Sequence, residues 1–154
     1  MQNTRNVTDS VIWVGANDRR IGLFENLFPV EKGVSYNSYV ILDEKTAVMD
    51  TADAAVTLQF LDNVRGALGG RELDYIVVNH MEPDHCANIE MLMRLYPGAK
   101  VVGNAKTFQF IRQFYEMDLE GRTVEVKEGD VLDLGYHKHQ FVFAPMVHWP
   151  EVMM

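Results

Sequence analysis

The sequence is poor in cysteine, in basic residues and in long apolar runs, and each shortage excludes a class of protein. With a single cysteine, Cys86, the chain cannot form an intrachain disulfide. The absence of disulfides is typical of proteins from the reducing cytoplasm. The chain has 14 lysines and arginines against 22 aspartates and glutamates, which gives a net charge of −8. It therefore lacks the basic surface that nucleic-acid-binding proteins usually carry. No apolar run approaches the roughly 20 residues of a membrane span, and the N-terminus lacks a signal-peptide apolar core. We therefore expect a cytoplasmic protein that binds neither nucleic acid nor membrane.

Length and pattern predict a single domain of mixed α/β class. A chain of 154 residues with 47% hydrophobic and 23% charged residues is ordinary for one globular domain. Strands are expected at 11–15, 37–42, 45–49, 73–78, 99–103, 123–127, 131–134 and 140–144, helices at 54–68, 87–96 and 105–117, and a turn at 16–18. Strand hairpins come first and strands alternating with helices follow, which indicates an α/β fold.

The stretch that follows the predicted strand at 73–78 is dense in potential metal ligands. They are His80, Glu82, Asp84 and His85. Clustered carboxylates at the end of a buried strand are costly without a cation, because they lose water and repel one another. Pro83 disfavours helical geometry at Glu82, so we expect an irregular loop rather than a helix here. The sequence therefore predicts most of a metal site.

A further histidine, His148, follows the predicted strand at 140–144. Ligands of open α/β sheets gather beyond the carboxyl ends of the strands. A lone histidine in such a loop is more often structural than a ligand. Beside the cluster that begins at His80, it predicts a metal pocket shared by two distant loops.

The string His-Met-Glu-Pro-Asp-His at 80–85 resembles the metal loop of flavodiiron proteins, within the metallo-β-lactamase fold superfamily. Further resemblances are Gly-Val-Ser-Tyr-Asn-Ser-Tyr at 33–39, Val-Met-Asp-Thr at 48–51 and Ala-Pro-Met-Val-His-Trp-Pro-Glu at 144–151. They run in order along nearly the whole chain. Glu82, where hydrolytic relatives carry histidine, is the most specific mark. The resemblance implies a metallo-β-lactamase-like αββα sandwich, of which this chain supplies the N-terminal portion.

The resemblance also implies a non-haem site for two iron ions. It assigns His80, Glu82 and His148 to one iron, and Asp84 and His85 to the second. Carboxylates are hard anionic donors that suit iron, whereas an all-histidine set suits zinc. The implied activity is the reduction of dioxygen to water or of nitric oxide to nitrous oxide.

The resemblance implies as well that part of the family pattern lies beyond Met154. Flavodiiron proteins are expected to supply a bridging aspartate and another histidine there. They also carry a flavodoxin-like domain that binds FMN and passes on electrons from a donor such as rubredoxin. We therefore expect 1–154 to be a partial diiron domain, with FMN only in a missing domain or a partner, and with weak binding of the second iron. An uncovered sheet face predicts a homo-oligomer.

Three interpretations of the site stay open on the sequence. The first is a diiron oxidoreductase domain that works with a flavin domain. The second is a diiron module that binds dioxygen as a sensor without catalysis. The third is a zinc hydrolase of the same superfamily, in which a metal-bound hydroxide attacks an ester or amide. Glu82 argues against the third, because a hydrolase gains little from a more anionic ligand set.

Three further residues could support the ligands. Asp50 could orient a metal ligand, or it could only stabilise the turn in which it lies. Trp149 is expected to form a wall of the pocket. Glu151 could accept a hydrogen bond from a ligand or be exposed.

Several other side chains have plain structural expectations. His137 and His139 are expected to be exposed in a polar turn, and Cys86 to pack at the start of a helix. Met91, Leu92 and Leu95 are expected in the core.

Overall fold

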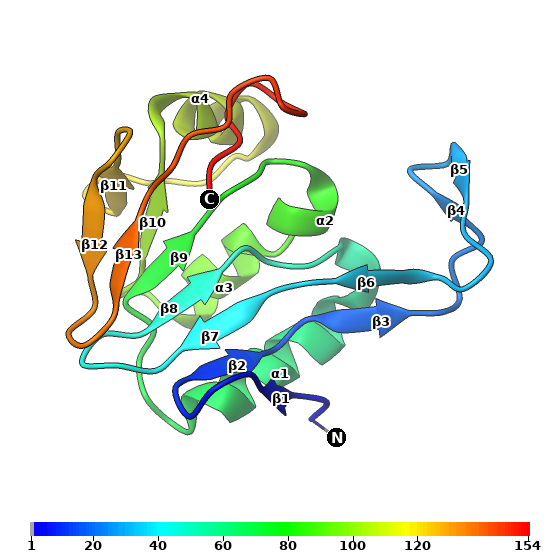
Figure 1. Cartoon of the computed structure of the whole chain (residues 1–154), viewed down its shortest axis with the longest axis horizontal. Helices are drawn as coiled ribbons and strands as arrows, with labels where there is room; N and C mark the ends of the chain where they lie inside the picture. Colours follow the sequence, from blue (N-terminus) through cyan, green and yellow to red (C-terminus); the bar gives the residue numbers. More distant parts are fainter. Residues whose placement is uncertain (1) are drawn as a thin grey trace.

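The computed structural model describes residues 2–154, and a seven-stranded mixed sheet forms its centre (Figure 1). The strands in spatial order are β1 (Arg5–Asn6), β2 (Val11–Trp13), β7 (Tyr39–Ile41), β8 (Ala47–Met49), β9 (Tyr75–Val77), β10 (Lys100–Gly103) and β11 (Thr123–Glu125). The pairs from β8 to β11 are parallel, and the pairs from β1 to β8 are antiparallel. The predicted hairpin at 37–49 and the α/β class are confirmed.

Alternate residues along the central strands point to opposite faces of the sheet, and both faces are covered. Ile76 and Val101 pack into one core, and their neighbours Val77 and Val102 pack into another. The first core lies under three helices: α1 (Thr57–Leu68), α3 (Ile89–Leu95) and α4 (Ala105–Phe114). The second lies under the hairpin of β12 (Val131–Asp133) and β13 (Lys138–Gln140). The strands at the centre are therefore apolar on both sides, which explains their continuous hydrophobic runs.

Short signals in the sequence mark the ends of the helices. Gly69, in the left-handed region at φ 60°, ends α1. Asn104 caps α4, because its side-chain oxygen accepts hydrogen bonds from the backbone N–H groups of Lys106 and Thr107, both at 3.0 Å. Asp53 caps the 3-10 turn η1 (Ala54–Val56), which precedes α1. The helix predicted at 105–117 ends earlier, at Phe114.

The expected turn at 16–18 is wrong. This segment is strand β3 (Ala16–Asp18), which pairs with β6 (Val34–Tyr36). The polar Asn17 is tolerated in the strand because the Ser35 hydroxyl donates to its side-chain oxygen at 2.5 Å. Between β3 and β6 the chain forms a second ribbon, β4 (Leu23–Phe24) and β5 (Phe28–Pro29), which projects from the body at the right of Figure 1.

The region after β9 is also more helical than expected. A short helix, α2 (Pro83–Cys86), replaces the loop predicted around Pro83. Proline is well tolerated in the first turn of a helix, where its missing N–H group would have no partner, so only 78–82 is irregular. The helix predicted at 87–96 is α3, which begins at Ile89. The strand predicted at 140–144 is mostly irregular, since β13 ends at Gln140.

The core predicted on α3 is partly wrong. Leu92 is fully buried, but Met91 and Leu95 are 39% and 54% exposed. Cys86 is buried, as expected. Over residues 2–154, no helix combines the length and apolar character that crossing a membrane requires.

His137 and His139 are half-buried, contrary to the prediction that they are exposed. The turn after β12 packs against two other turns, and His137 Nδ1 lies 2.6 Å from the Asp43 carboxylate and its Nε2 lies 3.0 Å from the Ser10 hydroxyl. The ring of His139 packs on Phe141 with a centroid distance of 4.8 Å, and burial lowers the pKa of His139. The sequence held no sign of these partners, which are distant along the chain.

The Asp43 cluster predicts that Asp43→Asn is less stable than the wild type at neutral pH and approaches it in strong acid. The backbone N–H of His137 holds the pKa of Asp43 well below its usual range, assisted by the His137 ring and the N–H groups of Glu44 and Tyr136. A lowered pKa in the folded state stabilises the fold above the unfolded-state pKa of about 4, and this contribution is lost as the pH falls through the folded-state value. We therefore expect Asp43→Asn to lower the melting temperature at pH 7.

Below about pH 4 the difference in melting temperature between wild type and Asp43→Asn should narrow progressively, because Asp43 of the unfolded wild type then takes up a proton while the folded state still resists it. Thermal melts followed by circular dichroism between pH 7 and pH 2.5 measure this. The exposed Asp9 on the same edge provides the control variant, Asp9→Asn. A constant difference at every pH would contradict the role given to the Asp43 charge.

Candidate metal centre

The candidate site lies at the carboxyl ends of three neighbouring parallel strands. Asp50 follows β8, His80 comes three residues after the last residue of β9, and Asn104 follows β10. Because these strands are parallel, the residues that follow them meet at one edge of the sheet. Asp50 adopts a left-handed conformation at φ 55°, which is unfavourable for a residue with a side chain and is concentrated at functional sites.

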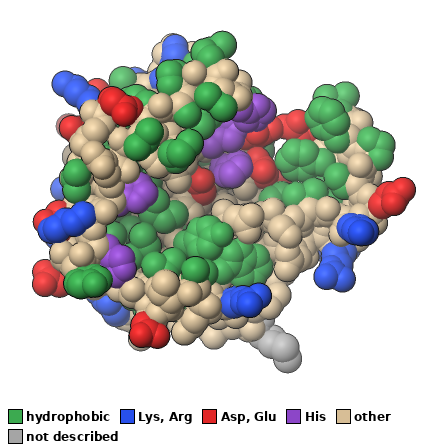
Figure 2. Space-filling model, in the orientation of Figure 1, with side chains coloured by type: hydrophobic (Ala, Val, Ile, Leu, Met, Phe, Trp, Pro, Cys, Tyr) green, Lys and Arg blue, Asp and Glu red, His purple; other side chains and the backbone are tan. Residues whose placement is uncertain are grey.

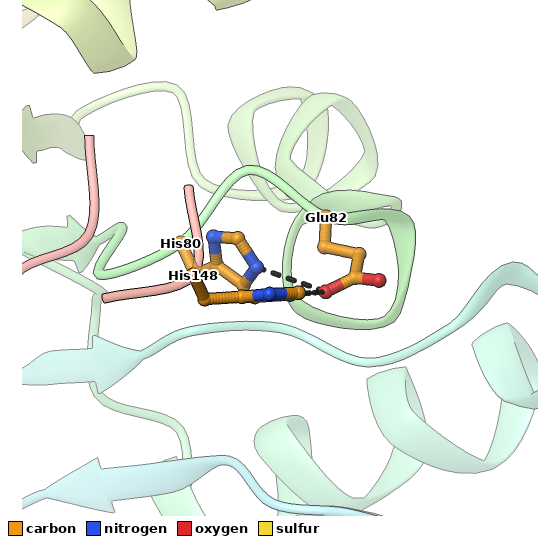
Figure 3. A group of neighbouring side chains, drawn as sticks. All are labelled: His80, Glu82 and His148. Carbon is orange, nitrogen blue, oxygen red and sulfur yellow. Dashed lines mark hydrogen bonds and ion pairs between the residues drawn. The ribbon is translucent and has the colours of Figure 1, made fainter. Parts of the chain in front are cut away.

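Three of the predicted ligands converge on one point. His80, Glu82 and His148 each offer a ligand atom, and these atoms lie within 4.8 Å of one another. Figure 3 shows both imidazoles directed at the Glu82 carboxylate: His80 Nε2 lies 2.9 Å and His148 Nε2 lies 2.8 Å from Glu82 Oε2. His80 and Glu82 are 7% exposed, whereas the side chain of His148 is 57% exposed. The cluster is therefore buried on one side and open to solvent on the other.

His148 lies 66 positions after Glu82 in the chain, and a backbone ribbon brings it to this point. The segment 142–154 folds back on itself, with Val142 and Met154 exchanging both backbone hydrogen bonds and Ala144 N–H donating to Val152 O. Met153 N–H donates to Asn79 O at 3.0 Å, which ties this ribbon to the loop that carries His80. His148 thus stands at the tip of a loop closed at its base.

The same ribbon contacts His80 on the side of the ring that faces away from Glu82. Its Nδ1 lies 2.8 Å from Glu151 Oε1, and this oxygen also accepts a hydrogen bond from Met81 N–H at 2.9 Å. The Glu151 side chain is fully buried, and Asn104 Nδ2 donates to the Glu151 backbone carbonyl at 2.7 Å. The ring of Trp149 stands perpendicular to that of His80 at a centroid distance of 5.2 Å. Glu151 is therefore buried rather than exposed, and Trp149 forms a wall beside His80.

The arrangement around His80 fits a cation. A neutral imidazole carries one proton, so only one of its nitrogens can donate, yet both nitrogens of His80 face carboxylate oxygens. A cation bound to Nε2 would satisfy this geometry, with Nδ1–H donating to Glu151. A carboxylate that orients the remote nitrogen of a histidine is a common partner of metal-bound imidazole.

The other two predicted ligands lie next to this group. His85 Nε2 lies 3.5 Å from the Asp84 carboxylate, and His85 Nδ1 lies 3.2 Å from Asp50 Oδ2. The rings of His80 and His85 are 5.2 Å apart. Asp84 Oδ1 is buried without a hydrogen-bond partner, which is unfavourable for a carboxylate oxygen unless a cation is near. Asp84 and His85 fit a second ion less completely than the first group, because only two residues contribute.

The electrostatics of the cluster favour an anionic Glu82. Burial raises the pKa of this carboxyl group, but hydrogen bonds with Glu25, His148 and His80 outweigh burial and lower it to about 2. Burial raises the pKa of Asp84, with a further contribution from the charge of Glu82. A cation would relieve the mutual repulsion of these acids.

The sequence did not predict Glu25 as part of this region. Glu25 lies in the turn between β4 and β5, and it lines the same cavity as Glu82 and Asp84. The pattern that could have revealed the turn is Glu-Asn between two apolar pairs, Leu-Phe at 23–24 and Leu-Phe at 27–28. Nothing in the sequence places that turn beside Glu82. Figure 2 shows histidine and acidic side chains gathered in a hollow between the body and the projecting hairpin.

Comparisons with known proteins agree with this fold. Residues 34–154 match the family model described as ODP family beta lactamase. The anaerobic nitric oxide reductase flavorubredoxin of Aliivibrio salmonicida is 37% identical over 153 residues, which are 98% of this chain and 30% of that protein. The flavodiiron protein from Giardia intestinalis superposes with a TM-score of 0.91 at 25% identity, over 99% of this chain and 37% of that one. The rubredoxin oxygen:oxidoreductase of Desulfovibrio gigas superposes with a TM-score of 0.87 at 26% identity, over 98% and 37%.

The family match extends over most of the chain and includes every predicted ligand. The chain spans about a third of the length of the relatives described above. It belongs to the ODP family of beta lactamases and has the N-terminal beta-lactamase-like fold of flavodiiron proteins.

Proposed function

We propose that this chain is the iron-binding part of an oxidoreductase that reduces dioxygen to water or nitric oxide to nitrous oxide. The observation that carries the proposal is the convergence of two imidazoles on the Glu82 carboxylate. The names of two relatives, a nitric oxide reductase and a rubredoxin oxygen:oxidoreductase, support the same chemistry.

In this proposal His80, Glu82 and His148 hold one iron, and Asp84 and His85 contribute to a second. A pair of iron ions would supply the redox chemistry that side chains lack. The chain's own residues bind the metal ions and orient the metal ligands. Glu151 fixes the orientation of the His80 ring, Asp50 fixes that of His85, and Glu82 provides the hard anionic donor that favours iron over zinc.

We propose further that electrons reach this centre from FMN in a flavodoxin-like domain, supplied by a donor such as rubredoxin. In this proposal 1–154 is part of a larger diiron domain, and the flavin belongs to another domain or a partner. Exposed apolar side chains beside the site and on the β12–β13 hairpin support burial against more protein, and we propose a homo-oligomer. They are Val131, Tyr136, Val142, Met146 and Val147.

Metal analysis and gas consumption test the function together. After anaerobic loading with ferrous iron, we expect mass spectrometry to find one to two irons per chain, with the second lost more easily on dialysis. When an FMN-containing reductase partner and NADH are added, an electrode should record consumption of nitric oxide or dioxygen above the level of the metal-free chain.

Each competing interpretation has its own signature in the same experiment. Zinc retained in preference to iron, with ester hydrolysis, would support a hydrolase and contradict the proposal. Iron that binds dioxygen reversibly without net consumption would support a sensor instead. Glu82 disfavours the hydrolase because a carboxylate makes the metal less electrophilic than a third histidine would.

A further inference from the structure

Asp50 and Thr51, two consecutive residues just after β8, contact His85 at its ring and at its backbone. The ring nitrogen Nδ1 of His85 lies 3.2 Å from Asp50 Oδ2. The backbone carbonyl of His85 accepts two hydrogen bonds from Thr51, one from its N–H at 2.7 Å and one from its hydroxyl at 3.0 Å. One short segment therefore holds both the ring and the backbone of this proposed ligand.

The Thr51 hydroxyl lies at the junction of α2 and α3. The carbonyl groups in the last turn of a helix have no partner within that helix, and His85 lies in α2, which has only four residues. The hydroxyl donates to the His85 carbonyl and accepts a hydrogen bond from Asn88 N–H at 3.2 Å, just before α3 begins. Thr51 is 0% exposed, so solvent does not compete for these two hydrogen bonds.

Asn88 extends the same connection to the segment that leads into α1. Its Nδ2 donates to Ala52 O at 2.6 Å, and its Oδ1 accepts from the Thr57 hydroxyl at 2.7 Å. The corner between α2 and α3 is thereby attached to 51–57 by several hydrogen bonds, most of them buried. The side chain of His85 is 33% exposed. Because this ring is only partly packed, its direction depends on the buried contacts of its backbone.

We propose that Thr51 is a positioning residue for the second metal ion, which fixes the backbone of His85 and thereby the direction of its ring. The inference deepens the proposed function and rests on it for the assignment of Asp84 and His85 to a second ion. The Thr51 hydroxyl contacts the corner after α2 and contacts none of the ligands proposed for the first ion. Its loss should therefore weaken the second ion selectively.

Cobalt(II) titration of the 154-residue chain tests the proposal, because this ion is stable in air and its visible spectrum reports coordination geometry. The wild type should bind cobalt in a tight step and a weak step. Thr51→Val replaces the hydroxyl with a methyl group and keeps the backbone N–H. We expect it to raise the dissociation constant of the weak step about 10-fold, the lower limit for partners that orient a metal ligand, and to leave the tight step and its spectrum unchanged. Thr51→Ser retains a hydroxyl and should restore the weak step.

Thr46 provides a matched control at the other end of β8. It is 1% exposed, and its hydroxyl donates to Glu72 O at 2.7 Å and accepts from Asp74 N–H at 3.1 Å. This is the same pair of backbone contacts that Thr51 makes, but away from the metal centre. Thr46→Val should therefore lower the midpoint of urea unfolding, as Thr51→Val does, and should change neither cobalt step.

Circular dichroism verifies that each variant is folded, and Thr51→Ala takes the place of Thr51→Val if the valine variant is not. An unchanged weak step with a lowered urea midpoint would make the Thr51 hydroxyl a structural group only. Equal losses in both steps, a loss that Thr51→Ser does not restore, or the same loss in Thr46→Val would also overturn its role. A wild type that binds one cobalt ion would remove Asp84 and His85 as ligands together with this inference. A wild type that binds none would overturn the proposed metal centre itself.

Discussion

Replacing Glu82 with alanine is expected to lower the affinity of the chain for ferrous iron by more than about 100-fold. Partners that only orient a ligand already contribute 10–100-fold, and Glu82 is proposed as a ligand itself. Its Oε2 atom is also the point on which His80 Nε2 and His148 Nε2 converge, at 2.9 and 2.8 Å. Without it, two imidazoles remain at the site, and one of them is largely exposed.

Thermal melting with and without anaerobic ferrous iron measures this effect. An ion that binds only the folded chain stabilises it by about 2.7 kcal/mol at 100 times the dissociation constant. The wild type should therefore melt at a higher temperature with iron, and Glu82→Ala should show almost no such increase. Glu125→Ala, at an exposed position on β11, should respond as the wild type does. An iron-dependent increase of full size in Glu82→Ala would remove this carboxylate from the ligand set.

Replacing Glu151 with alanine is expected to destabilise the fold and weaken metal binding together. The Glu151 side chain is fully buried, and one oxygen serves both His80 Nδ1 and Met81 N–H. Removing the carboxylate leaves two buried donors without an acceptor, which typically costs about 1–3 kcal/mol for each. The His80 ring also loses the acceptor that orients it, so iron affinity should fall about 10–100-fold.

The isosteric variant Glu151→Gln separates the charge from the hydrogen bonds. A glutamine oxygen can still accept from both donors, so this variant should lose about 1–2 kcal/mol, less than the alanine variant. Urea unfolding of the metal-free proteins gives the stability, and competition with a coloured chelator gives the affinity. Should Glu151→Ala unfold at the wild-type urea concentration, Glu151 would not be a buried support of His80.

The parts of the fold that local signals determine were predictable. The apolar runs of β9 and β10 are buried on both faces, and Gly69 and Asn104 end and begin helices through their own conformation and hydrogen bonds. The convergence of His148 on the His80 loop was predicted as well, although the strand expected directly before His148 is mostly irregular. Their role as metal ligands stays a prediction.

What the sequence did not reveal depends on partners that are distant along the chain. The segment at 16–18 looks like a turn because Asn17 and Asp18 favour turns, but pairing with β6 overrides that preference. His137 looks exposed in a polar turn until Asp43 is placed beside it. Glu25 has no local pattern that points to Glu82. In each case the local preference was weak and a long-range contact was decisive.

The closed ribbon at 142–154 has a consequence for when the proposed metal centre becomes complete. Pairing of Met154 with Val142 closes the ribbon that presents His148, and Met153, whose N–H donates to Asn79 O, joins it to the loop that carries His80. During synthesis, a nascent chain that already displays the whole His80 loop still lacks a complete binding site until residue 153 has been made and docked. In the proposed function, a complete iron site therefore forms only after residues 142–154 have been made and have packed against the loop that carries His80.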